Sequence, residues 1–102
     1  MGYVYILSNY KRTSLYIGVT NDVERRVLEH KLGIGSKHTT RYNLKYLMYY
    51  EKLPSITKAI EREKQLKNWH REWKWNLIKE QNPQLADLAA DWFTDADLNQ
   101  TS

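Results

Sequence analysis

Two short apolar segments near the amino terminus contain the residue types that β-strands favour. Residues 3–7 and 15–20 are rich in tyrosine and β-branched side chains, whereas residues 8–14 between them are polar and charged. This pattern predicts a β-hairpin with a long connecting loop. The tyrosines Tyr5 and Tyr16 occupy the two strands, eleven residues apart.

After the hairpin, the apolar spacing becomes that of a helix. Asn21 or Asp22 is suited to cap its amino-terminal end, and Gly33 is suited to end it. Arg26 and His30 lie one helical turn apart, so this helix presents both side chains on the same face.

The middle of the chain predicts a loop, a strand and a second helix. Residues 33–43 have no apolar period and predict a mobile basic loop. Residues 46–51 are dense in Leu, Met and Tyr and predict a third strand, after which Pro54 and Ser55 begin the helix. The predicted buried stripe of this helix consists of Ile56, Ala59, Ile60, Leu66 and Trp69.

The last third of the chain continues this helical pattern. Trp69, Trp73, Leu77 and Ile78 follow a helical period, either as core residues or as a platform for stacking bases. Asn82-Pro83 predicts the start of a further short helix. Its expected inner side consists of Leu85, Leu88, Ala89 and Trp92. We expect an α+β fold in one domain over residues 1–93, followed by a disordered acidic tail at 94–102.

Glu63 is a carboxylate within the apolar stripe of the second helix. It follows Ile60 by three residues and precedes Leu66 by three. A buried carboxylate needs a cation, a metal ion or hydrogen-bond donors as partners. The alternative is a place at the edge of the stripe, with Lys67 as its ion-pair partner one turn on.

The charge of the chain is unevenly distributed. All sixteen Lys and Arg residues fall within residues 1–79, which hold only seven acidic residues, whereas residues 80–102 hold five acids and no base. A body this basic favours a polyanionic partner such as nucleic acid, although basic surfaces also serve solubility or contact with membrane surfaces. The acidic end is either a solvated tail or a cover for the basic surface.

Several classes of protein are disfavoured by the composition. The chain has no cysteine, and His38 and His70 lack partners at ligand spacing, so neither disulfides nor a zinc site is expected. There is no long apolar run and no pattern typical of a signal peptide. We therefore expect a cytoplasmic protein that does not contact a membrane and has no small-molecule cofactor.

An ordered set of motifs resembles the GIY-YIG nuclease superfamily. Tyr3-Val4-Tyr5 and Tyr16-Ile17-Gly18 correspond to its two tripeptides, the second of them identically. Asn21 to Arg26 with His30, and then Ala59 to Lys67, complete the set in order. The chain is most similar to the small single-domain bacterial branch, and to the amino-terminal nuclease domain of the excision-repair endonuclease, over about residues 2–80.

The resemblance implies a three-stranded antiparallel sheet flanked by helices, with the active site beside the two tyrosines. By position in the motifs, Arg26 corresponds to the catalytic arginine, His30 to the helix histidine and Glu63 to the metal-binding glutamate. Tyr5 and Tyr16 correspond to the motif tyrosines, and which of them is the general base stays open. A late asparagine that many members use has no clear counterpart, Asn68 and Asn76 being the available residues.

The resemblance also implies a metal-dependent endonuclease that hydrolyses DNA with Mg²⁺ or Mn²⁺, with single-stranded or branched DNA as expected substrates. The alternative is a nucleic-acid-binding module of the same fold with little or no turnover. In the absence of a targeting domain, we expect specificity to come from basic loops or from a partner protein. The expected DNA-binding residues are Lys11, Arg12, Lys37, His38, Arg41 and Lys67.

Overall fold

The computed structural model describes residues 1–99 and contains one antiparallel sheet of three strands. These strands are β1 (Gly2–Ser8), β2 (Leu15–Thr20) and β3 (Tyr46–Leu53), in the order β2-β1-β3. The helices are α1 (Val23–Lys31), α2 (Lys37–Arg41), α3 (Ile56–Lys67), α4 (Arg71–Gln81) and α5 (Asp95–Leu98). The predicted α+β class, hairpin and three-stranded antiparallel sheet are confirmed.

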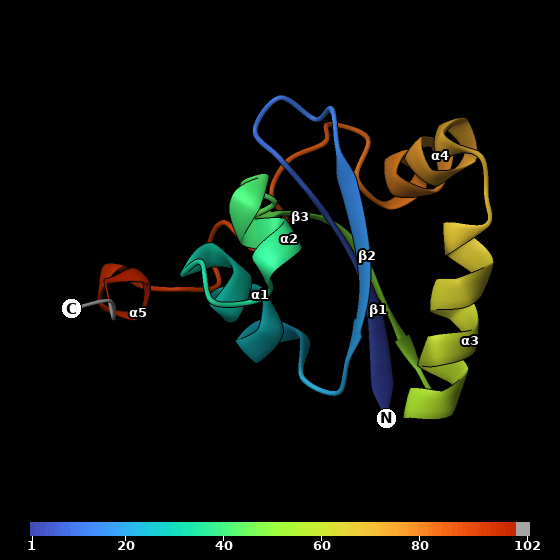
Figure 1. Ribbon diagram of the computed structural model, residues 1–102, viewed down its shortest axis with the longest axis horizontal. Helices are drawn as coiled ribbons and strands as arrows, with labels where there is room; N and C mark the ends of the chain where they lie inside the picture. The colour runs from blue at the N-terminus through green and yellow to red at the C-terminus, as the bar shows by residue number, and fades with distance from the viewer. Residues whose placement is uncertain (100–102) are drawn as a thin grey trace.

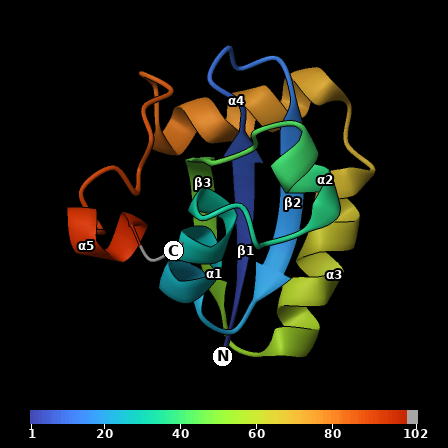
Figure 2. The same ribbon diagram turned by 60° about the vertical axis from the view of Figure 1, so that its left-hand side comes forward.

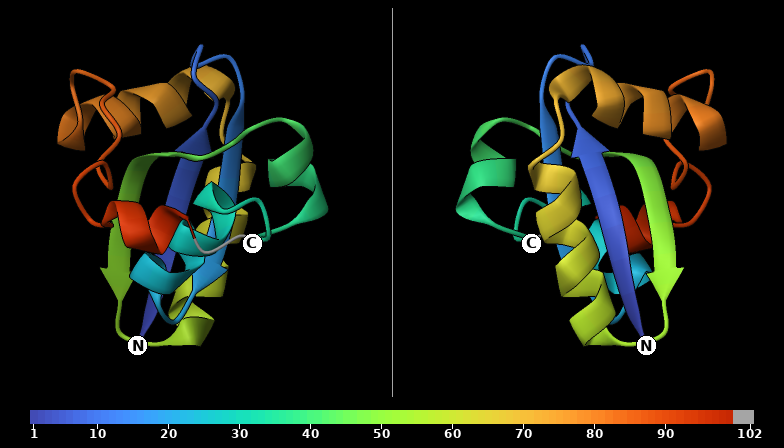
Figure 3. Two further views of the ribbon diagram at one scale, coloured as in Figure 1. Left: turned by 90° about the vertical axis from the view of Figure 1, so that its left-hand side faces the viewer. Right: turned by 90° about the vertical axis from the view of Figure 1, so that its right-hand side faces the viewer.

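The sheet separates two groups of helices (Figure 1). α1, α2 and α5 lie on one side of the sheet, whereas α3 and α4 lie on the other. Turned views show α2 in front of the edge strand β2, while α3 runs along the same edge from behind (Figure 2). The strand β2 therefore borders both groups of helices, and Figure 3 shows the same two layers from either side.

The central strand β1 contributes side chains to both layers. Val4 and Ile6 pack in the cluster with α3 and α4, and Tyr5 and Leu7 pack in the cluster with α1. This alternation is the period of two that a strand imposes. A register shift between Ile6 and Leu7 interrupts the pairing of β1 with β3. All four of these side chains are 1% exposed or less, so both clusters are true cores.

The short helix α2 corrects the prediction of a mobile loop at 33–43. Ser36 caps it by accepting a hydrogen bond from the backbone N–H of Thr39 at 3.1 Å. Thr39 is buried and is the inward side chain of the helix. The helix is a single turn, too short to give an apolar period, which is why the pattern at 33–43 looks like a loop.

The predicted caps of α1 and α3 are confirmed, whereas the predicted buried stripe of α3 is only partly correct. Asp22 caps α1 and Ser55 caps α3, each by accepting a backbone N–H three residues on. Ala59 and Leu66 are buried as expected, but Ile56 and Ile60 are 42% and 41% exposed, which corrects that part of the predicted stripe. The face of α3 that packs against the sheet is therefore narrower than the apolar residues of the helix predict.

The tryptophan segment does not continue α3. The chain leaves the helix at Asn68 and resumes in α4, which starts at Arg71. Trp69 packs partly against the core, but Trp73 is 54% exposed, so of the two roles predicted for this segment the core role is wrong for Trp73. The turn at 68–70 changes the phase of the helical period between Trp69 and Trp73.

Residues 83–93 form turns rather than the predicted short helix. The expected inner side chains nonetheless face the protein, with Ala89 buried and Leu85, Leu88 and Trp92 partly buried. Asn82 holds the start of this segment through hydrogen bonds from Nδ2 to the carbonyls of Met48 and Ala86. Side-chain bonds to β3 therefore replace helical bonds here.

A largely buried ion pair connects the same segment to the core. Lys31 Nζ lies 2.6 Å from Asp87 Oδ2, and each side chain is 13% exposed. Asp87 Oδ1 also accepts the backbone N–H groups of Leu47 and Ala89 at 3.0 Å. This one carboxylate joins α1, β3 and the turns at 83–93.

The prediction of a disordered tail at 94–102 is wrong for residues 95–98, which form the helix α5. Thr94 and Asp97 form a reciprocal capping box at its start. Residues 100–102, which the same prediction covered, lie outside the described residues. No helix within residues 1–99 has the length and apolarity needed to cross a bilayer.

Candidate active site

The ring of Tyr5 lies across the edge strand β2 at Gly18. Tyr5 and Gly18 are register partners on β1 and β2. A Cβ atom at Gly18 would come within 2.4 Å of both Cζ and the hydroxyl oxygen of Tyr5. Only a glycine lets the ring cross the strand here, so the Tyr5 hydroxyl is directed toward the outer edge of the sheet.

His30 meets the Tyr5 hydroxyl from helix α1. Tyr5 Oη and His30 Nε2 are 3.0 Å apart, and both residues are 1% exposed. On its other side, His30 Nδ1 lies 2.9 Å from Thr39 Oγ1 of α2. A Cβ atom at Gly35 would lie 2.2 Å from His30 Nδ1, so a second glycine makes room for this ring.

The buried histidine is neutral. Burial, with Arg26 adding to the effect, lowers the pKa of His30 to about 4, although Glu29 acts in the opposite direction. A neutral imidazole has one donor and one acceptor nitrogen. One ring nitrogen therefore donates a hydrogen bond and the other accepts one, with Tyr5 and Thr39 as the two partners. The Thr39 hydroxyl also lies 3.3 Å from the carbonyl oxygen of Ser36, to which it can donate. The Tyr5 phenol is thus the end of a hydrogen-bonded chain that reaches α2.

Arg26 lies beside Tyr5 on the same face of α1 as His30. Its Nη1 atom donates to Glu29 Oε1 at 3.0 Å, and its side chain is 29% exposed. Burial acts to lower the pKa of Arg26, but Glu29 and Tyr5 outweigh it and raise the pKa above its ordinary value. The guanidinium is a permanent charge, and Glu29 fixes its direction.

The Tyr5 phenol is held in its neutral form by its surroundings. Burial raises the pKa of its phenol to about 12, against the opposing influence of Arg26, and the nearby Tyr16 and Glu63 add to the rise. The same influences place Arg26, Tyr16 and Glu63 within electrostatic reach of one hydroxyl. The structure therefore brings Tyr5, Tyr16, His30 and Arg26 together from β1, β2 and α1, and the charge of Glu63 on α3 acts on the same hydroxyl.

Tyr16 stands at the partly exposed boundary of this group. Its ring centroid lies 6.3 Å from that of Tyr5 and 5.8 Å from that of His30. Whereas Tyr5 is almost completely covered, Tyr16 is only partly buried. Of the two tyrosines, Tyr16 is the one that a bound substrate can reach more readily.

Glu63 approaches from α3, on the other side of the sheet edge. Its side chain is 21% exposed, and Oε1 lies 3.5 Å from Lys67 Nζ. The carboxylate thus pairs with the lysine one turn on, and its charge also acts on the Tyr5 hydroxyl. The pair is loose, and Lys67 is 53% exposed, so the attraction between them is weak.

The donor set at Glu63 fits a hard divalent ion that keeps most of its water. Mg²⁺ commonly binds proteins through one or two carboxylates and retains several waters. Within residues 1–99, no group of three or more His, Asp or Glu side chains is arranged as a metal cage. A lone, partly exposed carboxylate suits Mg²⁺ or Mn²⁺ better than it suits zinc.

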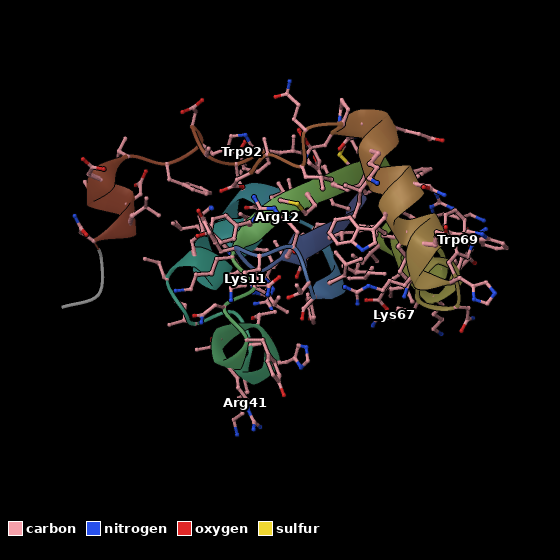
Figure 4. The ribbon with its side chains drawn as sticks, turned by 90° about the horizontal axis from the view of Figure 1, so that it is seen from above. Lys11, Arg12, Arg41, Lys67, Trp69 and Trp92 are labelled. Atoms are coloured by element: carbon pink, nitrogen blue, oxygen red, sulfur yellow. The ribbon has the colours of Figure 1, made fainter. Side chains whose placement is uncertain are left out.

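The predicted DNA-binding residues lie on different parts of the surface (Figure 4). Lys11 and Arg12 belong to the hairpin loop, Arg41 extends from α2 away from the sheet, and Lys67 lies near Trp69 at the end of α3. Lys37 is exposed at the start of α2. The structure therefore does not gather these residues into a single patch.

Two of these basic residues already have partners within the protein. Arg12 donates to the carbonyls of Leu85, Asn9 and Tyr10 at 3.1, 2.9 and 3.0 Å, and its guanidinium lies 4.9 Å from the centre of the Tyr46 ring. It fastens the hairpin loop to the turns at 83–93. Lys67 pairs with Glu63, as described above.

The residues that support the site are not among those predicted from the sequence. Thr39, Ser36 and Gly35 fall in the predicted loop, although a serine followed three residues later by a threonine is compatible with a helix cap. The sequence also does not show that the Tyr5 ring is what requires a glycine at position 18. Of the late asparagines, the buried one is Asn82, while Asn68 and Asn76 are exposed.

Comparisons with known proteins identify the family of this chain. The family model of the GIY-YIG catalytic domain matches residues 1–76. A UPF0213 protein of Haloquadratum walsbyi is 41% identical over 78 residues, which cover 76% of this chain and 86% of the relative. A UPF0213 protein of Staphylococcus haemolyticus is 38% identical over 76% of this chain and 94% of its own length.

A third relative is the UPF0213 protein of Natronomonas pharaonis, which is 39% identical over 78% of this chain and 92% of its own length. The name UPF0213 states no activity, metal or substrate. No solved structure matches the chain significantly. The resemblance inferred from the motifs is nevertheless confirmed by the family model and these relatives: the chain belongs to the GIY-YIG family, whose catalytic domain is of nuclease type.

Proposed function

We propose that this protein is a metal-dependent endonuclease that hydrolyses phosphodiester bonds in DNA. The observation that carries the proposal is the contact of Tyr5, Tyr16 and His30 at the edge of the sheet, with the charges of Arg26 on α1 and Glu63 on α3 acting on the Tyr5 hydroxyl. A phenol, a guanidinium and a carboxylate together meet the main needs of phosphodiester hydrolysis. The basic body of the chain favours a polyanionic substrate.

Arg26 is suited to bind the scissile phosphate. Glu29 holds Nη1, and the partial exposure of the side chain leaves the guanidinium accessible from the surface. A guanidinium can donate two parallel hydrogen bonds to a phosphate and stabilise the negative charge that builds up in the transition state. In this proposal Arg26 is therefore a catalytic residue that touches the substrate.

Tyr16 is the proposed acceptor of the proton from the attacking water. This role requires Tyr16 as a phenolate, its hydroxyl proton having passed to solvent. The water oxygen then forms a bond to phosphorus, the water proton passes to the phenolate oxygen, the bond to the leaving oxygen breaks, and the leaving oxygen takes a proton from solvent. The partly exposed position of Tyr16 favours it over Tyr5, which is covered and has its pKa raised to about 12 by burial. Tyr5 and His30 are positioning residues that hold the inner wall of the site.

Glu63 is the proposed metal ligand, and Lys67 is its partner in the free protein. A bound Mg²⁺ or Mn²⁺ supplies electrophilic stabilisation of the charge on the phosphate and on the leaving oxygen. Lys67 is exposed and loosely held, so it can turn away from the carboxylate at small energetic cost.

The proposal is tested by incubating the protein with labelled single-stranded and duplex oligonucleotides in Mg²⁺, in Mn²⁺ and in chelator. We expect cleavage with metal, none with chelator, and loss of cleavage but not of binding in Glu63→Gln. The matched control is Glu61→Gln, because Glu61 lies on the same helix, is 62% exposed and also pairs with a lysine, Lys58, at 3.4 Å.

Two outcomes would contradict the proposal in different ways. Cleavage by Glu63→Gln at the wild-type rate would show that Glu63 is not a catalytic metal ligand. A wild-type protein that binds DNA but never cuts it, in either metal, would favour the alternative of a binding module without turnover.

A further inference from the structure

Beyond Tyr16, a row of aromatic rings continues from the buried site to the surface. His38 of α2 lies 6.0 Å from Tyr16 between ring centroids, and Tyr42 lies 4.9 Å from His38. Burial decreases along the row, from Tyr5 at 1% exposed to Tyr42 at 49% exposed. The outermost rings, His38 and Tyr42, therefore have surface available for a ligand.

The outer end of this row opens into a surface hollow of about 220 Å³. The residues that line it are Ser14, Leu15, His38, Tyr42 and Arg71. These residues come from the end of the hairpin loop and the start of β2, from α2 with its carboxyl-terminal cap, and from the first turn of α4. The hollow lies next to Tyr16 in the chain and has room for a single nucleobase.

Arg71 gives the hollow its charge. Its Nη2 atom donates to the carbonyl oxygen of Thr13, which anchors the guanidinium beside the end of the hairpin loop. Within residues 1–99 this guanidinium makes no other hydrogen bond, so its remaining N–H groups can serve a ligand. No carboxylate lines the hollow. The surface therefore combines a cation with the faces of two aromatic rings.

We propose that this hollow binds one unstacked nucleotide of single-stranded DNA, next to the phosphate that Tyr16 and Arg26 address. The base stacks on Tyr42 and His38, and Arg71 binds the phosphate of the same nucleotide. This assignment rests on the proposed nuclease function and adds the class of substrate to it. It also gives a role to Arg71, which lies outside the motifs of the sequence.

The chemistry of the hollow distinguishes single strands from duplexes. Inside a duplex both faces of each base are covered by neighbouring bases, so an aromatic ring can stack only on a base that has left the helix. Proteins that bind single strands combine aromatic platforms with basic side chains along the backbone. The rings at His38 and Tyr42 supply the first component, and Arg71 supplies the second.

The test is a binding measurement in chelator, so that it does not depend on turnover. Fluorescence anisotropy is measured with a labelled oligothymidylate and with an abasic chain of the same number of phosphates. We expect Tyr42→Ala to weaken binding of oligothymidylate about tenfold and to leave binding of the abasic chain unchanged, because base stacking alone is lost. Tyr42→Phe keeps the ring and is expected to bind as the wild type does.

Arg71→Gln is expected to weaken binding of both chains, with the salt dependence of log K reduced by about 0.7. Lys79→Gln is the control for charge, because Lys79 is an exposed lysine in the last turn of the same helix. Ile34→Ala is the control for the loss of an exposed apolar side chain that precedes α2 and does not line the hollow.

The proposal is overturned if Tyr42→Ala binds oligothymidylate as tightly as the wild type does, or if it weakens binding of the abasic chain equally. Failure of the wild type to bind a single strand also overturns it. Because no metal is present, these results are independent of the cleavage assay with Glu63→Gln. If the protein cuts DNA but Tyr42→Ala has no effect on binding, the proposed nuclease function stands and the proposed nucleotide site is rejected.

Discussion

Gly18 and Tyr5 are in such close contact that any side chain at position 18 would have to displace the Tyr5 ring. The ring of Tyr5 occupies the space that a Cβ atom of residue 18 would fill, with two ring-end atoms only 2.4 Å from it. A β-strand residue seldom needs to be glycine for its own backbone conformation. Here the requirement comes from the side chain of the neighbouring strand.

Gly18→Ala is therefore expected to displace the Tyr5 ring and to lower the free energy of unfolding by about 1–3 kcal/mol, the usual cost of overpacking a core. Urea denaturation measures the loss of stability, and the cleavage assay measures the effect on the site. Wild-type stability together with wild-type cleavage in Gly18→Ala would show that the ring does not cross the strand at this point.

The buried His30 makes stability depend on pH. Its pKa lies at about 4 in the folded protein and near 6.5 when the chain is unfolded, with burial as the main cause. Between these values the unfolded chain binds more protons, so the free energy of unfolding falls as the pH is lowered from 6.5 toward 4. The maximum effect is about 3 kcal/mol.

The His30 prediction is checked by following the ring resonances of the histidine by NMR through an acid titration. We expect the His30 signal to remain that of a neutral ring until the pH approaches 4. A midpoint near 6.5 would contradict the buried hydrogen bonds to Tyr5 and Thr39.

The ion pair between Lys31 and Asp87 is expected to be important for stability. Asp87→Ala leaves Lys31 buried without its counter-charge and removes the acceptor for Leu47 and Ala89. Loss of one partner of a buried pair usually costs about 3–5 kcal/mol. Thermal or urea denaturation measures this loss.

Glu61→Ala is the control for the ion pair, because its pair with Lys58 is more than 60% exposed on both sides. We expect a change of less than about 1 kcal/mol for that variant. Equal effects of the two substitutions would mean that Asp87 contributes no more than a surface charge.

The sequence predicts the fold well where local chemistry determines the structure. The hairpin, the third strand and the caps at Asp22 and Ser55 depend on residue types within a few positions, and the structure has all of them. The prediction is wrong where tertiary contacts replace the local pattern. Asn82 and Asp87 hold residues 83–93 without a helix, and the turn at 68–70 exposes Trp73.

For the candidate site, the motif positions predict which side chains meet but not how they are supported. The contact of His30 with Thr39 joins residues nine positions apart across a turn, and the pattern at 33–43 gives no sign of it. The assignments of Glu63 to a metal and of Lys11, Lys37 and Arg41 to DNA stay predictions. A cytoplasmic location and a partner protein also stay predictions.

The central claim is that Tyr16, rather than Tyr5, takes the proton from the attacking water. The direct test is the single-turnover rate of DNA cleavage for the wild type, Tyr16→Phe and Tyr5→Phe in saturating Mg²⁺, with folding checked by circular dichroism. We expect Tyr16→Phe to lower the rate by about 100- to 10,000-fold, the range for loss of a general base. Tyr5→Phe loses one buried hydrogen bond to His30, so we expect about 1 kcal/mol lower stability and a rate within about tenfold of the wild type. Wild-type cleavage by Tyr16→Phe, or a far larger loss in Tyr5→Phe, would contradict this assignment.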